Sequence, residues 1–358
     1  MTTMMIMAGG TGGHVFPALA VARALRDQGV RIVWLGTRAG IEARVVPAAD
    51  FEIEYINIRG LRGGGWLRWL LLPMHLNIAM FQALRLLRRI KPDAVLAMGG
   101  FVSGPGSLMA SALRIPLLIH EQNAIAGLTN RWLVQIADVV MAGFPTAFGE
   151  RHGVRVVGNP VRREIVALPS PELRLASHHG RLRLLIVGGS QGAQVFNQIV
   201  PQALRALSEP SRPQVWHQTG KRDEASVAES YRDVTPDAKV TVFIEDMAVA
   251  YAWADLVVCR AGAMTIAELA AAGVAAILVP FPAAADDHQT ANARFLEARD
   301  AAVLLPQPQC TPARLAELLT SFAASRELLL RMAVNARACA TTDATETVAQ
   351  FCKEAAHA

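Results

Sequence analysis

The 358-residue sequence has little cysteine, and none of its apolar runs is long. Its four cysteines, Cys259, Cys310, Cys339 and Cys352, form no CxxC pair and no metal-ligand spacing, which is typical of a protein kept in a reducing compartment. No run approaches the about 20 apolar residues that a membrane span needs. The N-terminus also lacks the charged region and the small-residue cleavage site of a signal peptide. We therefore expect a cytoplasmic protein that is soluble or bound at a membrane surface.

Charged residues are scarce as well. They make up 18% of the sequence against 52% hydrophobic residues, a balance that argues against disorder and for large buried cores. The length favours about two domains. The net charge of +5 suits an anionic ligand, a nucleic acid or an acidic membrane surface, and does not choose among them. No basic stripe interleaves with aromatic residues, so we expect no nucleic-acid partner.

Two nucleotide-binding signatures are missing. Counted from Gly10, a GxGxxG fingerprint would need a third glycine where Val15 stands, and the acidic residue expected at the end of the second strand is absent. The segment Thr219–Arg222 reads TGKR and lacks the Ser or Thr that follows the lysine of a Walker A motif. The sequence therefore supports neither a nicotinamide enzyme nor a P-loop ATPase.

Short apolar runs alternating with helical segments fill the chain instead. Each run is followed by a glycine-rich or polar loop and then a helix, which predicts parallel sheets covered on both faces, an α/β fold. The predicted strands are Thr3–Ala8, Arg31–Leu35, Ala94–Met98, Pro116–His120, Asp138–Ala142, Leu182–Val187, Gln214–Gln218, Val240–Ile244, Leu256–Cys259, Ala275–Val279 and Ala302–Leu305.

The sequence also repeats itself at about half its length. The segment MMIMAGGTGGHVFPALAVARAL near the N-terminus resembles RLLIVGGSQGAQVFNQIVPQAL, so that Gly9 corresponds to Gly188. Each copy reads as a strand, a glycine turn and a helix, which predicts two Rossmann-like halves. The polar, proline-spaced segment Asn159–Arg181 is the predicted linker, and a final helix over about Ala344–Ala356 is left free to pack on either half.

Polar side chains follow several strands of the first half. His14 comes directly after the first glycine turn, and Glu121, Gln122 and Asn123 come directly after a strand. Open α/β sheets bind ligands at the carboxyl ends of their strands, so we expect these residues at a ligand site, with His14 and Glu121 as candidates for acid–base chemistry. A lone histidine is more often structural, the interpretation we prefer for His75 and His217.

The segment Asp255–Leu296 carries the corresponding signals of the second half. The turn RAGAMT places Gly262 and Thr265 where free amides at a helix start can hold a diphosphate. Glu268 lies in an otherwise apolar helix, and a carboxylate there can accept hydrogen bonds from a ribose diol. A glutamate in such a helix is usually only a solvated surface charge. Further along, Asp286 or Asp287 is expected to cap a helix, while Gln289 and Asn292 are spaced to reach sugar hydroxyls.

The segment Leu61–Arg89 combines an apolar cluster with flanking arginines. Trp66, Leu67, Trp69 and Leu70 suit a patch at the headgroup level of an anionic bilayer. The alternative is a helix packed on its sheet with snorkelling arginines. A lipid-linked substrate would favour membrane contact.

These motifs together resemble one family. GGTGGHVFPALAVA, GGFVSGPG, HEQNAIAGLTNR, VGNPVR, GGSQGA, CRAGAMTIAELAAAG and DDHQTANA match, in order and spacing, the motif set of the MurG transferases. That family adds N-acetylglucosamine (GlcNAc) from UDP-GlcNAc to undecaprenyl-pyrophosphoryl-MurNAc-pentapeptide. The resemblance implies a glycosyltransferase B fold, two Rossmann-like domains facing across a cleft. We expect residues 1–162 to form the acceptor domain and 163–341 the donor domain, with 342–358 packing back on the first.

The resemblance also implies roles for individual residues. Inversion at the anomeric carbon requires a base for the acceptor 4-hydroxyl, and we favour His14 over Glu121. No DxD metal motif is present, so we expect no cofactor and no metal, with helix N-termini and Arg162 stabilising the leaving diphosphate. Phe101 stands where some members carry tyrosine. The implied donor contacts are Thr11, Gly12, Gly13, Asn123, Arg162, Ser190, Ile244 (through its backbone), Ala263, Met264, Thr265, Ile266, Ala267, Glu268 and Gln289.

The implied setting is the cytoplasmic face of the bacterial inner membrane. The expected partners are UDP-GlcNAc, the lipid-linked acceptor and the anionic membrane surface, together with proteins of cell-wall synthesis and division.

Two other functions stay open at this point. A UDP-GlcNAc 2-epimerase shares the fold and the donor but leaves the Trp/Leu/Arg segment unexplained, and a non-catalytic nucleotide-sugar scaffold would bind UDP without turnover.

Overall fold

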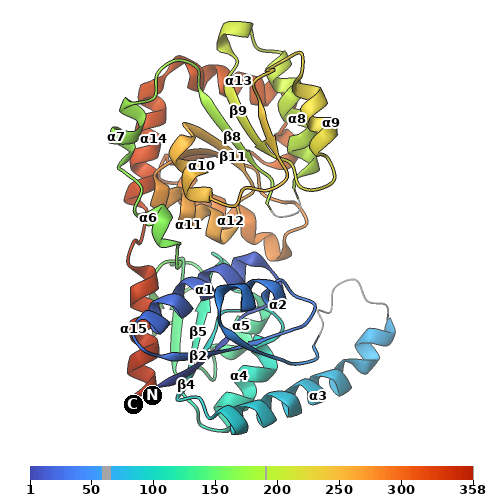
Figure 1. Cartoon of the computed structure of the whole chain (residues 1–358), viewed down its shortest axis with the longest axis vertical. Helices are drawn as coiled ribbons and strands as arrows, with labels where there is room; N and C mark the ends of the chain where they lie inside the picture. The colour runs from blue at the N-terminus through green and yellow to red at the C-terminus, as the bar shows by residue number, and fades with distance from the viewer. Residues whose placement is uncertain (59–65, 190–191, 358) are drawn as a thin grey trace. The chain divides into compact units, whose positions relative to one another are not determined.

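The computed structural model describes residues 1–58, 66–189 and 192–357, and of residues 66–72 and 285 only the backbone. The chain divides into two compact units. Unit 1 comprises Met1–Val161 and Thr341–Ala358, and unit 2 comprises Arg162–Ala340 (Figure 1). Each unit has its own sheet and its own buried core.

Unit 1 is built on a parallel sheet in the order β3-β2-β1-β4-β5-β6-β7. Strand β1 pairs with β2 on one side and β4 on the other, so the chain reverses its direction across the sheet between β1 and β4. The strands are β1 (Thr3–Met7), β2 (Arg31–Gly36), β3 (Glu52–Tyr55), β4 (Ala94–Ala97), β5 (Leu117–Glu121), β6 (Val139–Ala142) and β7 (Val154–Val156).

Helices cover both faces of this sheet. One buried cluster joins the sheet to α1 and α15, and the other joins it to α3, α4 and α5. Figure 1 shows α15, the last helix of the chain, beside α1, so the chain returns to unit 1 after completing unit 2. The helices are α1 (Gly12–Asp27), α2 (Glu42–Val45), the 3₁₀ turn η1 (Pro47–Ala49), α3 (Trp66–Ile90), α4 (Ser103–Ala112), α5 (Leu128–Leu133) and α15 (Ala344–Ala356).

Unit 2 repeats the plan with a parallel sheet in the order β10-β9-β8-β11-β12-β13. Here the reversal falls between β8 and β11, the counterparts of β1 and β4. The strands are β8 (Arg183–Val187), β9 (Gln214–Gln218), β10 (Lys239–Thr241), β11 (Leu256–Cys259), β12 (Ala275–Leu278) and β13 (Ala302–Leu304). Two Rossmann-like units with parallel sheets confirm the predicted fold class.

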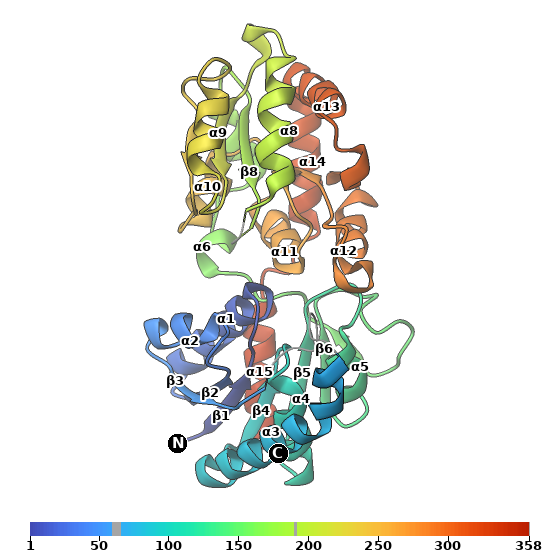
Figure 2. The ribbon, with the colours of Figure 1, turned by 90° about the vertical axis from the view of Figure 1, so that its right-hand side faces the viewer.

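The helices of unit 2 pack on both sides of its sheet, and Figure 2 shows α8 and α9 side by side. They are α6 (Arg163–Val166), α7 (Pro171–Ala176), α8 (Gln194–Arg205), α9 (Glu224–Tyr231), α10 (Met247–Trp253), α11 (Ala263–Ala272), α12 (His288–Glu297), α13 (Pro312–Ala324) and α14 (Arg326–Ala338). Three short 3₁₀ turns complete the unit: η2 (Glu209–Ser211), η3 (Ala285–Asp287) and η4 (Gln307–Gln309).

Candidate functional site

The glycine loops of both units lie where the strand order reverses. In unit 1 the loop after β1 meets the loop after β4, so closely that a Cβ on Gly100 would lie 2.2 Å from the carbonyl oxygen of Gly9. Gly100 also has φ +84°, a conformation that side chains other than glycine rarely adopt. Open α/β sheets bind ligands at such a point, which makes this edge the candidate site of unit 1.

Helix α1 starts directly from the first glycine loop. Its first internal hydrogen bonds are donated by the N–H groups of His14 and Val15 to the carbonyl of Thr11. The N–H groups of Gly12 and Gly13 therefore have no partner within the helix, and they lie at its positive end. Free N–H groups at this end of a helix suit an anionic or sugar oxygen, and the contacts predicted for Thr11, Gly12 and Gly13 stay a prediction.

A residue that the sequence analysis missed holds this loop in place. Glu42 is completely buried, and its carboxylate accepts hydrogen bonds from the N–H of Gly10 (3.0 Å) and from both the N–H (2.9 Å) and the hydroxyl (2.7 Å) of Thr37. It packs so tightly that a Cβ on Gly9 would lie 2.7 Å from its Oε1. A dinucleotide fold has an acidic residue at the end of its second strand, and β2 has none there; the acidic residue of this chain is Glu42. It comes a few residues later, in α2, and binds the loop.

His14 is half-buried at the start of α1. Its Nδ1 lies 2.9 Å from Oε1 of Gln122, and its ring packs on the backbone of Gly99, where a Cβ would lie 2.6 Å from Nδ1. The first glycine loop, the β4 loop and the β5 loop thus converge on one imidazole. A histidine held at the edge of a ligand site suits general base chemistry.

Glu121 has a different environment. It is 2% exposed, and four donors surround its carboxylate: the N–H and Nδ2 of Asn123 at 2.9 and 3.0 Å, the N–H of Gly127 at 3.0 Å and Nδ2 of Asn130 at 2.9 Å. A buried carboxylate saturated with donors holds a loop and has no open side from which to take a substrate proton. Glu121 therefore does not fit the role of second candidate base, and it orients Asn123 instead.

The second glycine loop is held by the strand next to it. Gly192 has φ +74°, and a Cβ there would lie 2.0 Å from the carbonyl oxygen of Thr219, at the end of β9. Nε2 of Gln218 donates to the carbonyl of Gly189 at 2.7 Å. Ser190, one of the predicted donor contacts, lies outside the described residues.

Helix α11 presents free amides at the end of β11. Its first internal hydrogen bond is donated by the N–H of Ile266 to the carbonyl of Gly262. The N–H groups of Ala263, Met264 and Thr265 therefore have no partner within the helix, which suits a diphosphate.

The predicted contact through Ile266 is corrected by this geometry. The side chain of Ile266 is completely buried, and its N–H is bonded inside the helix, so neither is available to a ligand. The next residue, Ala267, is half-buried.

Glu268 is the acidic centre of unit 2. Its Oε1 accepts from Arg162 at 2.9 Å, its Oε2 accepts from the hydroxyl of Tyr251 at 3.1 Å, and its side chain is 14% exposed. Burial is the largest single influence and lowers the pKa of Arg162. The charge of Glu268 and its hydrogen bond, with smaller contributions from Tyr251 and Glu164, together exceed it and raise the pKa overall. Burial, reinforced by the same charge, raises the pKa of Tyr251, which therefore stays protonated as a donor. A carboxylate oriented from two sides still has lone pairs for a ribose diol.

The remaining predicted donor contacts differ in availability. Strand β10 ends at Thr241 and not at the predicted Ile244, so Ile244 lies in the loop that follows. In the part of the chain that the structure describes, no group forms a hydrogen bond with the backbone of Ile244. Oε1 of Gln289 accepts from the N–H of Phe281 at 2.9 Å and so ties the β12 loop to α12. Asn292 is completely buried and donates to the carbonyl of Ala261 at 3.1 Å, so it supports the turn and does not reach a sugar.

The expected cap of α12 is not formed as predicted. Asp287 is the N-cap residue, but its carboxylate accepts a hydrogen bond from the hydroxyl of Thr290 at 2.7 Å. The carboxylate does not cap the helix by bonding a backbone N–H. Asp286 and Asp287 both have left-handed backbones, at φ 50° and 51°. This pair of residues makes the sharp turn into the helix that carries Gln289.

Arg260 is a second residue that the sequence analysis did not single out. Its Nη1 donates to the carbonyls of Val279 and Pro280 at 3.1 and 3.2 Å, and its guanidinium lies over the rings of Phe196 and Phe281. Burial lowers the pKa of Arg260, but the usual pKa of arginine is so high that the side chain remains a cation. Arg260 thus joins the ends of β11 and β12, three residues before the start of α11.

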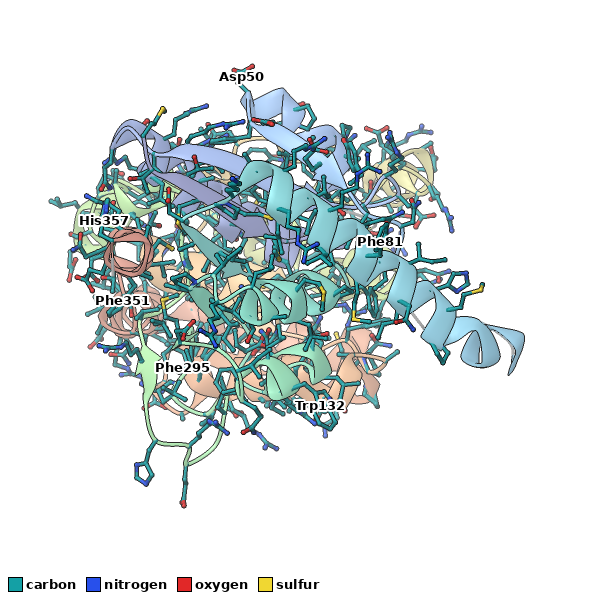
Figure 3. The ribbon with its side chains drawn as sticks, turned by 90° about the horizontal axis from the view of Figure 1, so that it is seen from below. Asp50, Phe81, Trp132, Phe295, Phe351 and His357 are labelled. Atoms are coloured by element: carbon teal, nitrogen blue, oxygen red, sulfur yellow. The ribbon has the colours of Figure 1, made fainter. Side chains whose placement is uncertain are left out.

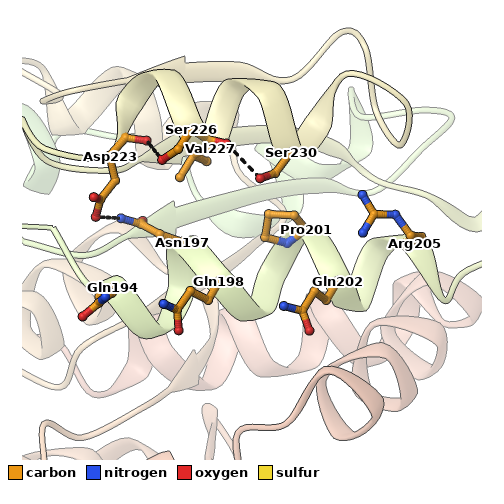
Figure 4. A pocket seen from close by; sticks show the side chains of 10 residues that line it. All are labelled: Gln194, Asn197, Gln198, Pro201, Gln202, Arg205, Asp223, Ser226, Val227 and Ser230. Atoms are coloured by element: carbon orange, nitrogen blue, oxygen red, sulfur yellow. Dashed lines mark hydrogen bonds between the residues drawn. The ribbon is translucent and has the colours of Figure 1, made fainter.

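A separate hollow of about 320 Å³ runs along α8 and α9 (Figure 4). The polar groups of its wall bond to one another: Asn197 donates to Asp223 at 2.7 Å, Ser226 to the carbonyl of Asp223 and Ser230 to that of Ser226. It lies along the helices and not at the strand ends, so we assign no role to it.

Helix α3 carries an exposed stripe on one side. Met74, Ile78 and Phe81 follow one another at helical spacing and are 51%, 42% and 67% exposed, and Arg85 and Arg88 continue the same face. Figure 3 shows α3 with Phe81 and, on α5, Trp132, which is 72% exposed. The opposite face of α3 is buried through Ala79, Ala83 and Leu87.

The side chains of Trp66, Leu67, Trp69 and Leu70 lie outside the described residues, so the predicted membrane contact through them stays a prediction. Within the part of the chain that the structure describes, no helix is both long and apolar enough to cross a bilayer.

Known proteins similar to this chain show its family. The glycosyltransferase family 28 N-terminal domain matches residues 4–142, and the C-terminal domain of the same family matches residues 183–350. A relative from Marinobacter nauticus is 52% identical over 99% of this chain and 97% of its own length. One from Alkalilimnicola ehrlichii is 55% identical over 99% of both. Both are named UDP-N-acetylglucosamine–N-acetylmuramyl-(pentapeptide) pyrophosphoryl-undecaprenol N-acetylglucosamine transferase.

Solved structures give the same result. The crystal structure of Acinetobacter baumannii MurG matches with a TM-score of 0.87 and 43% identity, covering 99% of this chain and 100% of that one. A UDP-GlcNAc 2-epimerase from Neisseria meningitidis matches with a TM-score of 0.66 over 99% and 100% of the two chains, but at 13% identity it shares the fold alone. Because it is about half identical to these relatives over nearly its full length and contains both family 28 domains, the chain belongs to the MurG family of glycosyltransferases.

Proposed function

We propose that this protein transfers GlcNAc from UDP-GlcNAc to the 4-hydroxyl of MurNAc in undecaprenyl-pyrophosphoryl-MurNAc-pentapeptide, with inversion at the anomeric carbon. The observation that carries the proposal is identity of 52% and 55%, over nearly the whole of both chains, to relatives named for this transfer. The epimerase alternative has only a shared fold in its favour, at 13% identity.

Unit 2 is the donor side in this proposal. The unpaired N–H groups of Ala263, Met264 and Thr265 take the diphosphate at the start of α11. Glu268 accepts the ribose hydroxyls, while the free backbone groups of Ile244 face the uracil. Arg162 neutralises the leaving diphosphate, and Gln289 and Ser190 complete the set of contacts. The first-turn geometry and the Arg162–Glu268–Tyr251 cluster support this assignment.

Unit 1 is the acceptor side. His14 removes the proton of the acceptor hydroxyl, while Thr11, Gly12 and Gly13 offer amides and a hydroxyl to anionic or sugar oxygens. Asn123, held by Glu121, faces the donor sugar. The support is the convergence of three loops on His14 and the free N–H groups of Gly12 and Gly13.

The location in this proposal is the cytoplasmic face of the bacterial inner membrane. The exposed stripe of Met74, Ile78 and Phe81, continued by Arg85 and Arg88, suits a helix that seats apolar side chains among lipids and cations among anionic headgroups. Docking there would bring the enzyme to its lipid-linked acceptor. Proteins of cell-wall synthesis and division are the further partners that the family membership suggests.

The deciding experiment measures UDP release from UDP-GlcNAc by the purified protein, with and without a lipid-pyrophosphoryl-MurNAc-peptide acceptor, in the presence of EDTA. Acceptor-dependent release that survives EDTA is the expected result, because helix N-termini and Arg162 are assigned the work that a metal does in other transferases. UDP binding without release would favour the scaffold, and acceptor-independent turnover of the donor would favour the epimerase.

A pair of variants locates the chemistry within the proposed site. Arg162→Met is expected to lower kcat, because it removes the cation assigned to the leaving group, whereas Arg163→Met, one residue along, changes a side chain with no such assignment. Equal activity of Arg162→Met and the unmodified protein would remove Arg162 from the mechanism.

A further inference from the structure

A chain of hydrogen bonds runs from His14 into the interior of unit 1. Nδ1 of His14 lies 2.9 Å from Oε1 of Gln122, and Nε2 of Gln122 lies 3.2 Å from Nδ1 of His120. Nε2 of His120 lies 2.9 Å from the carbonyl oxygen of Gly158. His120 and Gln122 are 0% and 1% exposed, so bulk water does not compete with the inner contacts.

The direction of these hydrogen bonds can be worked out from the far end. The carbonyl of Gly158 can only accept, so Nε2 of His120 carries a hydrogen. Burial lowers the pKa of His120 to about 4, more than its bond to Gly158 and the charge of Glu121 raise it. The ring is therefore neutral at neutral pH, and its Nδ1 presents a lone pair.

The amide of Gln122 has only one orientation that satisfies its neighbours. Its Nε2 lies against two acceptors, the Nδ1 lone pair of His120 and, at 3.3 Å, the backbone carbonyl of His120. The reverse orientation would set the amide oxygen against both of these acceptors. Asn159 fixes the backbone as well, since its Nδ2 donates to the carbonyl of Gln122 at 2.9 Å. Oε1 of Gln122 consequently faces His14.

Because an amide oxygen can only accept, Nδ1 of His14 must carry the hydrogen in this contact. The lone pair of the neutral ring is then on Nε2, to which no group bonds in the part of the chain that the structure describes. We infer that Gln122, oriented by His120 and Gly158, is a positioning residue that holds His14 in the one tautomer able to accept a proton at Nε2.

This inference deepens the proposed function, and what it predicts for kcat rests on that function. In the transfer, the acceptor hydroxyl oxygen forms a bond to the anomeric carbon, while the bond from that carbon to the diphosphate breaks and its electron pair leaves with UDP. The hydroxyl proton passes to Nε2 of His14. The ring then carries both hydrogens, and its Nδ1–H remains bonded to Oε1 of Gln122, which also stabilises the cation formed.

The tautomer is measured by long-range ¹H–¹⁵N correlation spectroscopy of the full-length protein at about pH 8, where an ordinary imidazole is neutral. The His14 signals are assigned by their loss in His14→Ala. We expect a protonated Nδ1 and an unprotonated Nε2 in the unmodified protein, and a mixture of tautomers in Gln122→Leu, which keeps a similar volume without an acceptor. Gln135→Leu, at an exposed position of unit 1, is the control and should leave the signals unchanged. An Nε2-protonated His14 in the unmodified protein would overturn the inference.

Kinetics separate a positioning role from a merely structural one. We expect Gln122→Leu to lower kcat about ten- to a hundredfold with the KM for UDP-GlcNAc within about twofold, because the donor contacts of unit 2 are untouched. In a His14→Ala background, Gln122→Leu should have no further effect, since its influence passes through that ring. Multiplicative losses in the double variant would contradict the inference, as would a Gln122→Leu protein of full activity.

The same series distinguishes failure of this inference from failure of the proposed function. Unfolding curves and UDP binding show whether Gln122→Leu is folded. If His14→Ala keeps full acceptor-dependent turnover, the inference falls while the transferase function stands. If the unmodified protein shows no acceptor-dependent UDP release, the proposed function falls, and the spectrum still decides the tautomer.

Discussion

At the scale of single residues, Gly99 determines where the imidazole of His14 can lie. Gly99 has φ +102°, and a Cβ there would lie 2.6 Å from Nδ1 of His14. The ring fills the space that the missing side chain leaves, and the same contact aims Nδ1 at Gln122. A position that looks like a simple turn residue therefore sets the geometry of the proposed base.

We expect Gly99→Ala to lower kcat by tenfold or more, because a displacement of about 1 Å at a reacting group can reduce the rate a hundredfold. Donor binding should be unchanged. Gly153→Ala is a matched control, since Gly153 also has a left-handed backbone, at φ +83°, but a Cβ there meets nothing within 4 Å. Steady-state kinetics of both variants check this prediction, and an equal loss of kcat in the two would attribute the effect to backbone strain alone.

Glu42 acts on the first glycine loop through its carboxylate. Glu42→Gln replaces one acceptor oxygen by an N–H₂ group, which then faces either the N–H of Gly10 or the donors of Thr37. We expect the free energy of unfolding to fall by about 2–3 kcal/mol, because a buried donor is left unsatisfied, and kcat to fall with it. Glu52→Gln, which breaks only the exposed ion pair with Arg31, should change stability by less than about 1 kcal/mol. Urea unfolding measures both, and similar values for the two would show that Glu42 does not anchor the loop.

At the scale of elements, helix α11 is held from its C-terminal end, while the amides at its N-terminal end are the proposed diphosphate contacts. It ends at Gly273 in the left-handed conformation, and two arginines donate to its last carbonyls. Arg174, only 6% exposed, bonds the carbonyls of Ala272 and Gly273, and Arg337 bonds the carbonyl of Ala271. These cations also complement the negative end of the helix dipole.

Arg174→Met is therefore expected to lower the free energy of unfolding by about 2–3 kcal/mol, because it leaves two buried carbonyls without their charged donor. Arg314→Met is the control, since Arg314 makes only an exposed pair with Glu317 on α13 and its loss should be nearly neutral. Denaturant unfolding of the two variants measures the difference. If Arg174→Met is as stable as the unmodified protein, the arginines do not cap α11.

The elements that the sequence predicted best are the interior strands. The prediction matches the structure residue for residue at Leu256–Cys259, a short, continuous apolar run of the kind that buried parallel strands form. It also matches at Gln214–Gln218, where only Val215 and Trp216 are apolar. The two edge strands of unit 1 were missed. Strand β3 alternates charged and apolar residues in the sequence EIEY, and β7 has only three residues, so neither forms an apolar run.

The candidate site was predictable only in part. Glycine turns and strand ends are local signals, and they led directly to His14, the start of α11 and Glu268. The contacts of Glu42 with Gly10, and of Gln122 with His14 and His120, join segments far apart in the chain. No local pattern encodes them. The same holds for Ile266 and Asn292, whose complete burial depends on how α11 and α12 pack.

At the scale of the whole molecule, each unit contains a histidine that is buried in its neutral form. Burial lowers the pKa of His120 in unit 1 to about 4 and that of His217 in unit 2 to about 3. In the unfolded chain both titrate near 6.5, so the unfolded state takes up protons first as the pH falls. The contribution of these two histidines to the free energy of unfolding is therefore fully present above about pH 6.5. It is lost progressively as the pH falls from there to the pKa values of the folded state.

His217→Gln tests the pH dependence in unit 2, because glutamine does not titrate. In the unmodified protein the hydroxyl of Tyr231 lies 2.8 Å from Nδ1 of His217, and the amide of glutamine can still form this hydrogen bond. Between pH 7 and pH 5 the variant should lose about 2 kcal/mol less unfolding free energy than the unmodified protein. Urea unfolding at both pH values, followed by the circular dichroism of the full chain, gives the comparison. Identical pH dependence in the two proteins would mean that His217 is not buried neutral.

The proposed membrane docking depends on the surface of the whole molecule. In the proposed docking, the net charge of +5 would attract anionic lipid weakly and generally, whereas the α3 stripe would supply local apolar contact, with Phe81 67% exposed. Phe81→Ser is expected to reduce binding to vesicles of phosphatidylglycerol and phosphatidylethanolamine about tenfold, since it removes one large apolar side chain from the bilayer interface. Flotation of the protein with these vesicles measures the bound fraction.

Leu173→Ser is the matched control for Phe81→Ser. Leu173 is 70% exposed, but it lies on α7 of unit 2, outside the stripe. If docking used general hydrophobicity or net charge alone, both variants would bind vesicles alike. A selective loss in Phe81→Ser, with UDP binding unchanged, instead assigns the contact to α3 and places the membrane on unit 1, the proposed acceptor side.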